Sequence, residues 1–439
     1  MTKKAMGALA AALLAVVTAT IAFANQTASR GPVTAAAADT TDGSGAVVVD
    51  WNKTLVQIVN TPGAQPATIH PTRSFAILHA AIYDAVVSIT HSGQPYLIAV
   101  NAPPRARADA AAAQAGHDVL VALYPSWVAS LDQELSAELA AIPDGSSKLQ
   151  GMEVGRLAAA SLLAARTGDG SSVVPPGLAD GTQPGQYRRT PPNNAPAVFT
   201  QWPAVSPFVL QRADQFRPAP PPALSSTAYA TAYNEVKRLG QNTSTTRSGD
   251  QTQAAKFWPG PIWVQWNEIA EASALNHHTD LVHTAKLFAL LNLSFADTVI
   301  AFYDAKYHYL LWRPITAIRE GDNDGNPATA GDPSWTPLLT TAPDPAYAGA
   351  HSAVSGAGAA VLTSVFGRHD KIKVSSDSVA GVLRSFDSYD AAASEAGLSR
   401  IYGGVHTRYD HEAGLQLGQE VARFVLSESG SPGFGFLGT

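Results

Sequence analysis

The sequence predicts an all-α protein, and three features support this prediction. Alanine is abundant, and runs of β-branched residues are few. Apolar residues recur mostly at steps of three and four, which is the spacing of one helix face. Short breaks such as Pro125-Ser126 and Pro143-Asp144-Gly145 separate these segments, as in antiparallel helices joined by short loops. We therefore expect two helical bundles packed into one domain, without a central sheet.

The first 24 residues have the organisation of a secretory signal peptide. Two lysines precede an apolar run from Ala5 to Val17, which is too short to cross a bilayer, and Ala22-Phe23-Ala24 fits a signal-peptidase site. Removal of residues 1–24 predicts a secreted or extracytoplasmic protein. No other stretch is expected to form a stable membrane span in the mature chain.

The remaining chain is interpreted as one domain between two flexible ends. Residues 25–46 are rich in Ala, Thr, Gly and Ser without periodicity, which predicts a flexible leader. Residues 47–429 form the expected helical domain, and the glycine-rich residues 430–439 a flexible tail. The prolines of residues 170–224 predict an irregular strap anchored by aromatic side chains; a linker between two domains is the alternative.

Helices are expected on both sides of the strap. Before it, the periodic segments are 66–89, 106–124, 127–142 and 148–166. After it, they are 225–240, 249–258, 262–275, 279–312, 352–366, 376–395 and 409–427. The segment 279–312 carries the longest apolar-periodic run, interrupted at most once.

Composition limits the kinds of site that the chain can carry. The 439 residues include no cysteine, which excludes disulfides, thiolate metal sites and cysteine nucleophiles. The formal net charge is −6, with 15% charged residues, which argues against non-specific binding to nucleic acid. Any cationic site must therefore be local. The length permits a core large enough for stability without disulfides.

Two cations stand near the end of the longest helical segment. Lys306 and Arg313 are seven residues apart, so on one helix they are nearly two turns apart and point the same way. Pro314 is expected to end this helix just after the arginine. Two exposed, snorkelling cations would give the same pattern, so this pair alone does not define a site.

A small-residue turn, Ala348-Gly349-Ala350, leads to His351 and to a helix expected to start near Ser352. Backbone N–H groups at a helix start are anion donors, and small residues let the backbone approach a ligand. A lone histidine at this position is otherwise a helix cap or a packed core residue.

Arg400 and His406 flank a second turn that contains Gly403 and Gly404. Asp410 can fix the tautomer of His406 by a hydrogen bond to one ring nitrogen. It can equally cap the helix that follows.

A buried Arg400 would need a carboxylate partner, because an unpaired buried guanidinium is costly. Asp250 is the candidate, in the segment Arg247 to Thr252. Asp297 and Asp304 are the alternatives.

In this order the three segments resemble the vanadium-dependent haloperoxidases and their relatives, the type 2 phosphatidic acid phosphatases and bacterial acid phosphatases. The family pattern is Lys, six residues, Arg-Pro; then Pro-Ser-Gly-His; then Ser-Arg, five residues, His, three residues, Asp. The chain matches the first segment (306–314) and the third (399–410) at every signature position. The similarity is to secreted bacterial members of the haloperoxidase branch. It extends over roughly residues 50–427, with specific motifs only in 300–412.

The resemblance implies the helical-bundle fold of haloperoxidases and acid phosphatases, and makes residues 47–429 a catalytic domain. It also implies a vanadate cofactor, whose site phosphate can occupy. The implied anion-binding residues are Lys306, Arg313, Gly349, Ala350, Arg400 and His406. His406 is the implied vanadium ligand, His351 the acid–base group, and Lys306 the group that polarises bound peroxide. Hydrogen peroxide, a halide and a small organic acceptor are the implied partners.

The middle segment departs from the family pattern, because Gly349-Ala350 stands where the family has Ser-Gly. The chain therefore lacks a hydroxyl that normally donates to the anion. Replacing Gly349 by serine is expected to restore this donor and to raise affinity about tenfold, unless the backbone there uses a φ that only glycine tolerates. Ser352 lies on the other side of His351.

Three functions remain open from the sequence. Oxidation of a halide by hydrogen peroxide to hypohalous acid is favoured, because the helical region before the site is longer than a minimal phosphatase needs. Hydrolysis of a phosphate ester is the alternative, with His406 as the nucleophile that forms a phosphohistidine and His351 as the proton donor. A non-catalytic oxyanion binder is the third.

Overall fold

The computed structural model describes residues 44–431 and residue 434. The predicted signal peptide, nearly all of the predicted leader and most of the predicted tail lie outside the described residues. Within them the α-helices, in chain order, are α1 (Ala46–Asn60), α2 (Pro71–Thr90), α3 (Ala108–Leu123), α4 (Val128–Ala140), α5 (Ser146–Ala165), α6 (Thr227–Gly240), α7 (Gly249–Phe257), α8 (Ile262–Asn276), α9 (Leu281–Tyr309), α10 (Pro314–Arg319), α11 (Ala350–Phe366), α12 (Tyr389–Tyr402) and α13 (Arg408–Glu428).

The prediction of an all-α fold is confirmed. In the described part of the chain, the strands are β1 (Ile372–Ser375) and β2 (Leu383–Phe386), which form one antiparallel hairpin with Ile372 opposite Phe386. All other regular structure there is helical, and three short 3-10 turns lie at Pro125–Trp127, Trp202–Ala204 and Gly321–Asn323.

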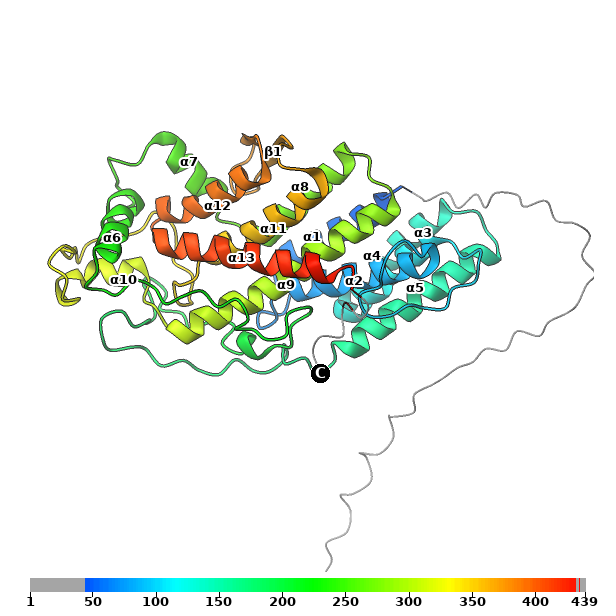
Figure 1. Cartoon of the computed structure of the whole chain (residues 1–439), viewed down its shortest axis with the longest axis horizontal. Helices are drawn as coiled ribbons and strands as arrows, with labels where there is room; N and C mark the ends of the chain where they lie inside the picture. Colours follow the sequence, from blue (N-terminus) through cyan, green and yellow to red (C-terminus); the bar gives the residue numbers. More distant parts are fainter. Residues whose placement is uncertain (1–43, 432–433, 435–439) are drawn as a thin grey trace, which may run out of the picture. The chain divides into compact units, whose positions relative to one another are not determined.

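The long helix α9 joins two groups of helices (Figure 1). The first group is α2, α3 and α5, which contact one another, and α2 also packs on α9. The second group includes α11, α12 and α13, and both α11 and α13 contact α9. Leu281–Tyr309 is long and apolar enough to span a membrane, but 94% of its most apolar stretch is buried inside the protein. We interpret α9 as the core helix of the bundle.

Helices α11 and α13 pack so closely that their backbones are in contact. A Cβ atom at Gly418 would lie 1.8 Å from the carbonyl oxygen of Ala353, and one at Gly414 would lie 2.3 Å from that of Gly349. A larger residue at either position would force the helices apart. The approach brings the two helix starts together, and the N–H of Gly349 donates to the carbonyl oxygen of Asp410 at 2.9 Å.

Two buried aspartates attach irregular segments to the helices. Asp84 of α2 accepts from the backbone N–H groups of residues 96–98 at 2.6, 2.9 and 3.0 Å. Asp297 of α9 accepts from those of residues 208–210 at 2.6, 2.7 and 2.8 Å. Residues 208–210 belong to the stretch 170–224, which we propose to be a strap over one domain.

One predicted helix is wrong in its first half. The segment 376–395 contains β2 and only the beginning of α12, which starts at Tyr389. In β1, Ile372 and Val374 are buried while their neighbours are exposed, which is the period-two pattern of a strand. Gly381 has a φ of +78° between the strands, a conformation that breaks a helix.

The predicted helix through Lys306 and Arg313 is also wrong at its end. Helix α9 stops at Tyr309, and Leu310 adopts a left-handed conformation with φ +50°. Pro314 does not end a helix but begins α10, with Arg313 as the preceding cap residue. Proline is favourable at a first helical position, where its missing N–H has no intrahelical acceptor. The two cations therefore lie on different elements.

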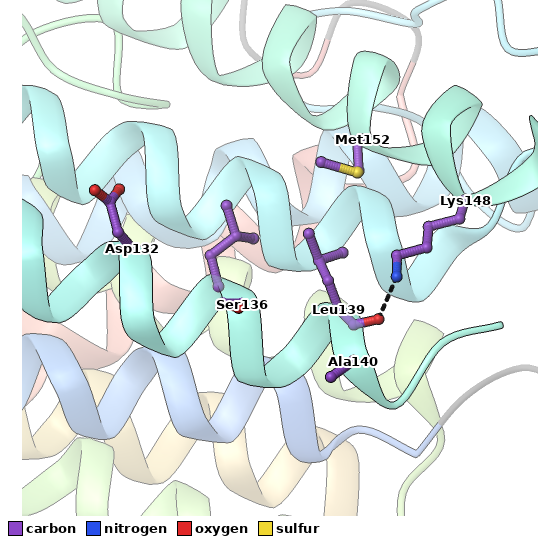
Figure 2. A pocket seen from close by; sticks show the side chains of 7 residues that line it. Asp132, Ser136, Leu139, Ala140, Lys148 and Met152 are labelled. Carbon is purple, nitrogen blue, oxygen red and sulfur yellow. Dashed lines mark hydrogen bonds between the residues drawn. The ribbon is translucent and has the colours of Figure 1, made fainter. Parts of the chain in front are cut away.

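A surface hollow of about 500 Å³ lies between α4 and α5 (Figure 2). Its lining residues are Asp132, Leu135, Ser136, Leu139, Ala140, Lys148 and Met152. Lys148 donates to the carbonyl oxygens of Leu139 and Ile142, so its ammonium is engaged by the end of α4. None of the predicted site residues lines this hollow, so it is separate from the predicted anion-binding site.

We expect Asp297→Ala to lower the free energy of unfolding by about 3–5 kcal/mol, because it leaves three buried N–H groups without an acceptor. Urea denaturation measures the change. Asp50→Ala is the control, since Asp50 is an exposed residue paired with Lys53 on α1, and its loss should change stability by no more than about 0.5 kcal/mol. Equal effects of the two substitutions would refute the anchoring role of Asp297.

Candidate functional site

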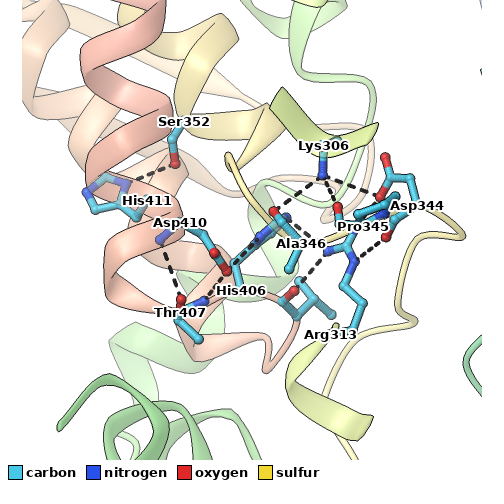
Figure 3. A network of polar contacts seen from close by, with 11 residues as sticks. Lys306, Arg313, Asp344, Pro345, Ala346, Ser352, His406, Thr407, Asp410 and His411 are labelled. Atoms are coloured by element: carbon cyan, nitrogen blue, oxygen red, sulfur yellow. Dashed lines mark hydrogen bonds and ion pairs between the residues drawn. The ribbon is translucent and has the colours of Figure 1, made fainter. Parts of the chain in front are cut away.

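The predicted site residues come from helix ends and the loops beside them. Figure 3 shows Lys306, Arg313 and His406 among them. Lys306 lies in the last turn of α9, Arg313 precedes α10, and His351 lies in the first turn of α11. Arg400 lies in the last turn of α12, and His406 lies in the loop before α13. Lys306, Arg313, Arg400 and His406 are all buried.

Arg313 connects several segments through its guanidinium. Its Nη1 donates to the carbonyl oxygen of Val405 at 2.9 Å and to Nε2 of His406 at 3.0 Å. Its Nε donates to the carbonyl oxygen of Asp344 at 2.7 Å, and its Nη2 contacts the carboxylate of the same residue. The arginine thus fixes the loops before α11 and α13 relative to α10.

Lys306 faces the same loop before α11. Its Nζ donates to the carbonyl oxygens of Pro345 and Ala346 and lies 3.5 Å from Oδ1 of Asp344. Burial lowers the pKa of Lys306 to about 8, although the charge of Asp344 opposes this effect. The ammonium is therefore charged at neutral pH and loses its proton in mildly alkaline solution.

His406 is held as a neutral imidazole. Its Nδ1 lies 3.3 Å from Oδ2 of Asp410, and its Nε2 faces Arg313. Burial, and then the charges of Arg313 and Lys306, hold the pKa of His406 well below its usual range. We assign the proton to Nδ1, which donates to the carboxylate. The lone pair of Nε2 then points toward the cations.

Of the two roles left open by the sequence, Asp410 meets the ring of His406, whereas its expected role as the N-cap of the following helix is wrong. Thr407 is the N-cap of α13, and its hydroxyl accepts from the N–H of Asp410. Oδ2 of Asp410 accepts in return from the N–H of Thr407 at 2.8 Å. The same oxygen meets the ring of His406, so one capping box aligns both the helix and the imidazole.

His351 and Arg400 have polar atoms without a partner among the described residues. These are Nε2 of His351, and Nε and Nη1 of Arg400. Burial, followed by the charge of Arg400, holds the pKa of His351 well below its usual range. Burial and the charge of Arg313 lower the pKa of Arg400 to about 10. These atoms can therefore bind a ligand without breaking a hydrogen bond within the protein.

The predicted pairing of Arg400 with Asp250 is wrong. Asp250 lies in the first turn of α7 and pairs at 2.9 Å with Arg384 of the hairpin. Its side chain is 73% exposed, so it faces the surface. The two alternative partners are also engaged elsewhere, since Asp297 holds the strap and Asp304 pairs with Arg217.

The expected role of the Gly349 backbone as an anion donor is not supported, because its N–H is bonded to the carbonyl oxygen of Asp410. Its φ is −70°, which any residue adopts. Ala350 opens α11, and its N–H has no intrahelical acceptor. The hydroxyl of Ser352 cannot replace the missing serine, since it bonds Nδ1 of His411 at 2.9 Å.

Two features of the site were missed in the sequence. Asp344 places a carboxylate against Lys306 and Arg313, and no motif marks it beyond its position between two prolines. His70 caps α2 inside a cluster of rings, with centroids 4.4 Å from Trp263 and 6.2 Å from Tyr303. Tyr303 precedes Lys306 by nearly one turn of α9, so this cluster of rings lies next to the cationic site.

Comparison with known proteins identifies relatives of this chain. Residues 286–431 match the family described as the VCPO second helical-bundle domain. The vanadium chloroperoxidase of Curvularia inaequalis is 26% identical over 266 residues. This match covers 44% of the chain and 43% of that relative, so the chain matches less than half of the relative's length.

Solved structures give a broader match. A bacterial vanadium-dependent iodoperoxidase superposes with a TM-score of 0.77 and 26% identity, over 91% of this chain and 98% of that one. A holo-type bacterial vanadium-dependent chloroperoxidase has a TM-score of 0.65 and 16% identity, over 84% and 94% of the two chains; at this identity the match shows the fold alone. The resemblance indicated by the motifs, and the helical-bundle fold, are confirmed.

The geometry changes the expectation for Gly349→Ser. A Cβ atom there would lie 3.0 Å from the carbonyl oxygen of Asp410, which is backbone of α13 and cannot rotate away. We now expect the substitution to destabilise the protein by about 1–3 kcal/mol rather than to strengthen anion binding. Thermal unfolding compared with Gly249→Ser, where the added atom meets nothing within 4 Å, measures this. A more stable Gly349→Ser protein would contradict the steric argument.

Proposed function

We propose that this chain, as a relative of the vanadium haloperoxidases, binds vanadate and oxidises a halide with hydrogen peroxide to hypohalous acid. One observation carries the proposal: buried cations from three elements gather beside two neutral histidines, and several of their polar atoms have no protein partner among the described residues. Leaving such atoms unpaired is costly. The oxygens of a tetrahedral oxyanion supply the missing acceptors.

The residues present fit vanadate, provided that Nη1 of Arg313 releases Nε2 of His406, to which it is hydrogen-bonded at 3.0 Å. Lys306, Arg313 and Arg400 would hold its oxygens through charge-assisted hydrogen bonds, and Nε2 of His406 would be the ligand of vanadium. When bound, vanadate supplies a Lewis acid that activates peroxide without changing its own oxidation state.

The side chains around the anion have separate tasks in this proposal. The ammonium of Lys306 donates to a peroxide oxygen and draws electron density from it. The ring of His351 is neutral in the free protein, and its unprotonated nitrogen accepts a proton from incoming peroxide. Asp410 keeps the proton of His406 on Nδ1, which preserves the Nε2 lone pair. Halide arrives from solvent, and hypohalous acid leaves to react with a small organic acceptor.

Phosphate-ester hydrolysis is the second candidate, and the neutral His406 favours it as well. An imidazole with an unprotonated Nε2 is a nucleophile toward phosphorus. His351 would then protonate the leaving alcohol.

A third candidate is a protein that binds an oxyanion without turnover. The observation that favours it is the N–H of Gly349, which is already bonded to the carbonyl oxygen of Asp410. Secretion remains part of the proposal and rests on residues 1–24.

His406→Ala should abolish halide oxidation, because it removes the vanadium ligand. Lys306→Ala should retain binding of vanadate with an affinity about ten- to a hundredfold lower, the worth of one bond to a charged group. Equilibrium dialysis with vanadate, and halogenation of a dye with bromide, chloride and iodide, measure the two effects.

His277→Ala is the matched control, since this histidine is partly exposed and pairs with Asp370; its activity should equal that of the wild type. A phosphate-ester assay on the same proteins separates the second candidate. Small and equal effects of His406→Ala and Lys306→Ala would reject the assignment of the site. No turnover in either assay, with normal oxyanion binding, would leave the third candidate.

Anion affinity should depend on the charge of Lys306. Because burial lowers the pKa of Lys306 to about 8, the ammonium is intact below this pH and is lost above it. We expect wild-type affinity for phosphate to fall between about pH 8 and 10, by up to about tenfold per unit. Lys306→Arg stays charged throughout this range and corrects for ionisation of the ligand. Parallel pH profiles of the two proteins would show that Lys306 does not contact the anion.

A further inference from the structure

A carboxylate occupies part of the cationic site. Asp344 is buried, with an exposed fraction of 5%. Its Oδ1 contacts both Lys306 and Arg313 (Figure 3), and its backbone carbonyl oxygen accepts from Nε of Arg313 at 2.7 Å. Two of the three predicted anion-binding cations are therefore already paired with an anion of the protein itself. Arg400, the third, has no such partner among the described residues.

The position of Asp344 is fixed by its sequence neighbours. Pro343 and Pro345 flank it, and a residue before proline is restricted to extended conformations. The carbonyl oxygens of residues 344, 345 and 346 all accept from Arg313 or Lys306. Arg313 and Lys306 thus hold the backbone of the loop, and the carboxylate lies against the same two cations.

Asp344 keeps its negative charge in this setting. Burial raises the pKa of its carboxyl group, but the charges of Lys306 and Arg313 outweigh burial and bring the pKa below its ordinary value. An oxyanion that binds the same two cations therefore meets a like charge at close range. This repulsion grows in proportion to the charge of the ligand.

We propose that Asp344 is an internal competitor of the oxyanion, which lowers affinity and selects against ligands of higher charge. The carboxylate must give up contacts with Lys306 and Arg313 when an oxyanion binds there. A dianion is then penalised about twice as strongly as a monoanion of similar shape. This inference rests on the proposed oxyanion site but not on turnover.

The test compares two tetrahedral anions of different charge, sulfate as the dianion and perchlorate as the monoanion. Asp344→Asn keeps the shape of the side chain and removes its charge. We expect sulfate to bind this variant about tenfold or more tightly than it binds the wild type, since like charges in contact weaken binding by at least about tenfold, and perchlorate to gain less. Isothermal titration calorimetry of the full chain measures both affinities.

Asp169→Asn is the matched control, because Asp169 is another buried carboxylate, paired with Arg73 and Arg166. It should leave both affinities unchanged. Asp344→Glu retains the charge and should keep the weak affinity of the wild type. If Asp344→Asn does not fold, as shown by thermal unfolding, Asp344→Ser is the second neutral variant and carries the same expectation.

Each outcome separates this inference from the proposed function. Unchanged or weaker sulfate binding in the neutral variant, with vanadate still bound by the wild type, overturns the role of Asp344 alone and would make it a residue that positions the cations. Equal gains for sulfate and perchlorate overturn the charge selection. Failure of the wild type and of the neutral variant to bind vanadate, phosphate or sulfate rejects the oxyanion site itself, and the inference with it.

Discussion

The guanidinium of Arg313 is the group on which the arrangement of the site depends. It bonds the loop before α11 through Asp344 and the loop before α13 through Val405 and His406. These three segments are far apart in the sequence, and this one side chain bonds all of them. Since every contact uses a different N–H of one planar group, the loops cannot shift independently. The geometry available to a ligand is therefore set largely before it arrives.

The electrostatics of the site follow from placing this cation in the interior. Lys306, Arg313 and Arg400 are buried close to His406, and their charges, after burial, depress its pKa. Neutral histidines and charged lysine and arginine side chains can coexist in such a site because cations disfavour protonation of an imidazole. The same field attracts an anion. Burying these cations together costs stability, although the same charges attract the ligand. The carboxylate of Asp344 offsets part of the repulsion between Lys306 and Arg313.

Spacing motifs in the sequence pointed to the cations and histidines, because the order of residues at a helix end is a local property of the chain. The structure buries Lys306, Arg313, Arg400 and His406 close to such ends. The helices on both sides of the strap were predictable for the same local reason. Asp344 was not, since its role arises only when two loops and α9 meet. The pairing of Arg400 with Asp250 failed because burial of one partner says nothing about which carboxylate lies nearby. Pro314 was misread because proline both ends and begins helices.

The close approach of α11 and α13 gives the departure from the family pattern a different meaning. Gly414 and Gly418 let the two backbones touch, and this contact leaves the carbonyl oxygen of Asp410 3.0 Å from the place of a Cβ atom at position 349. The glycine at position 349 thus suits the tight packing of these helices, because a serine there would push the two backbones apart by a few tenths of an ångström. A hydrogen-bond donor that takes the place of the serine hydroxyl would therefore come from a residue outside the contact between α11 and α13.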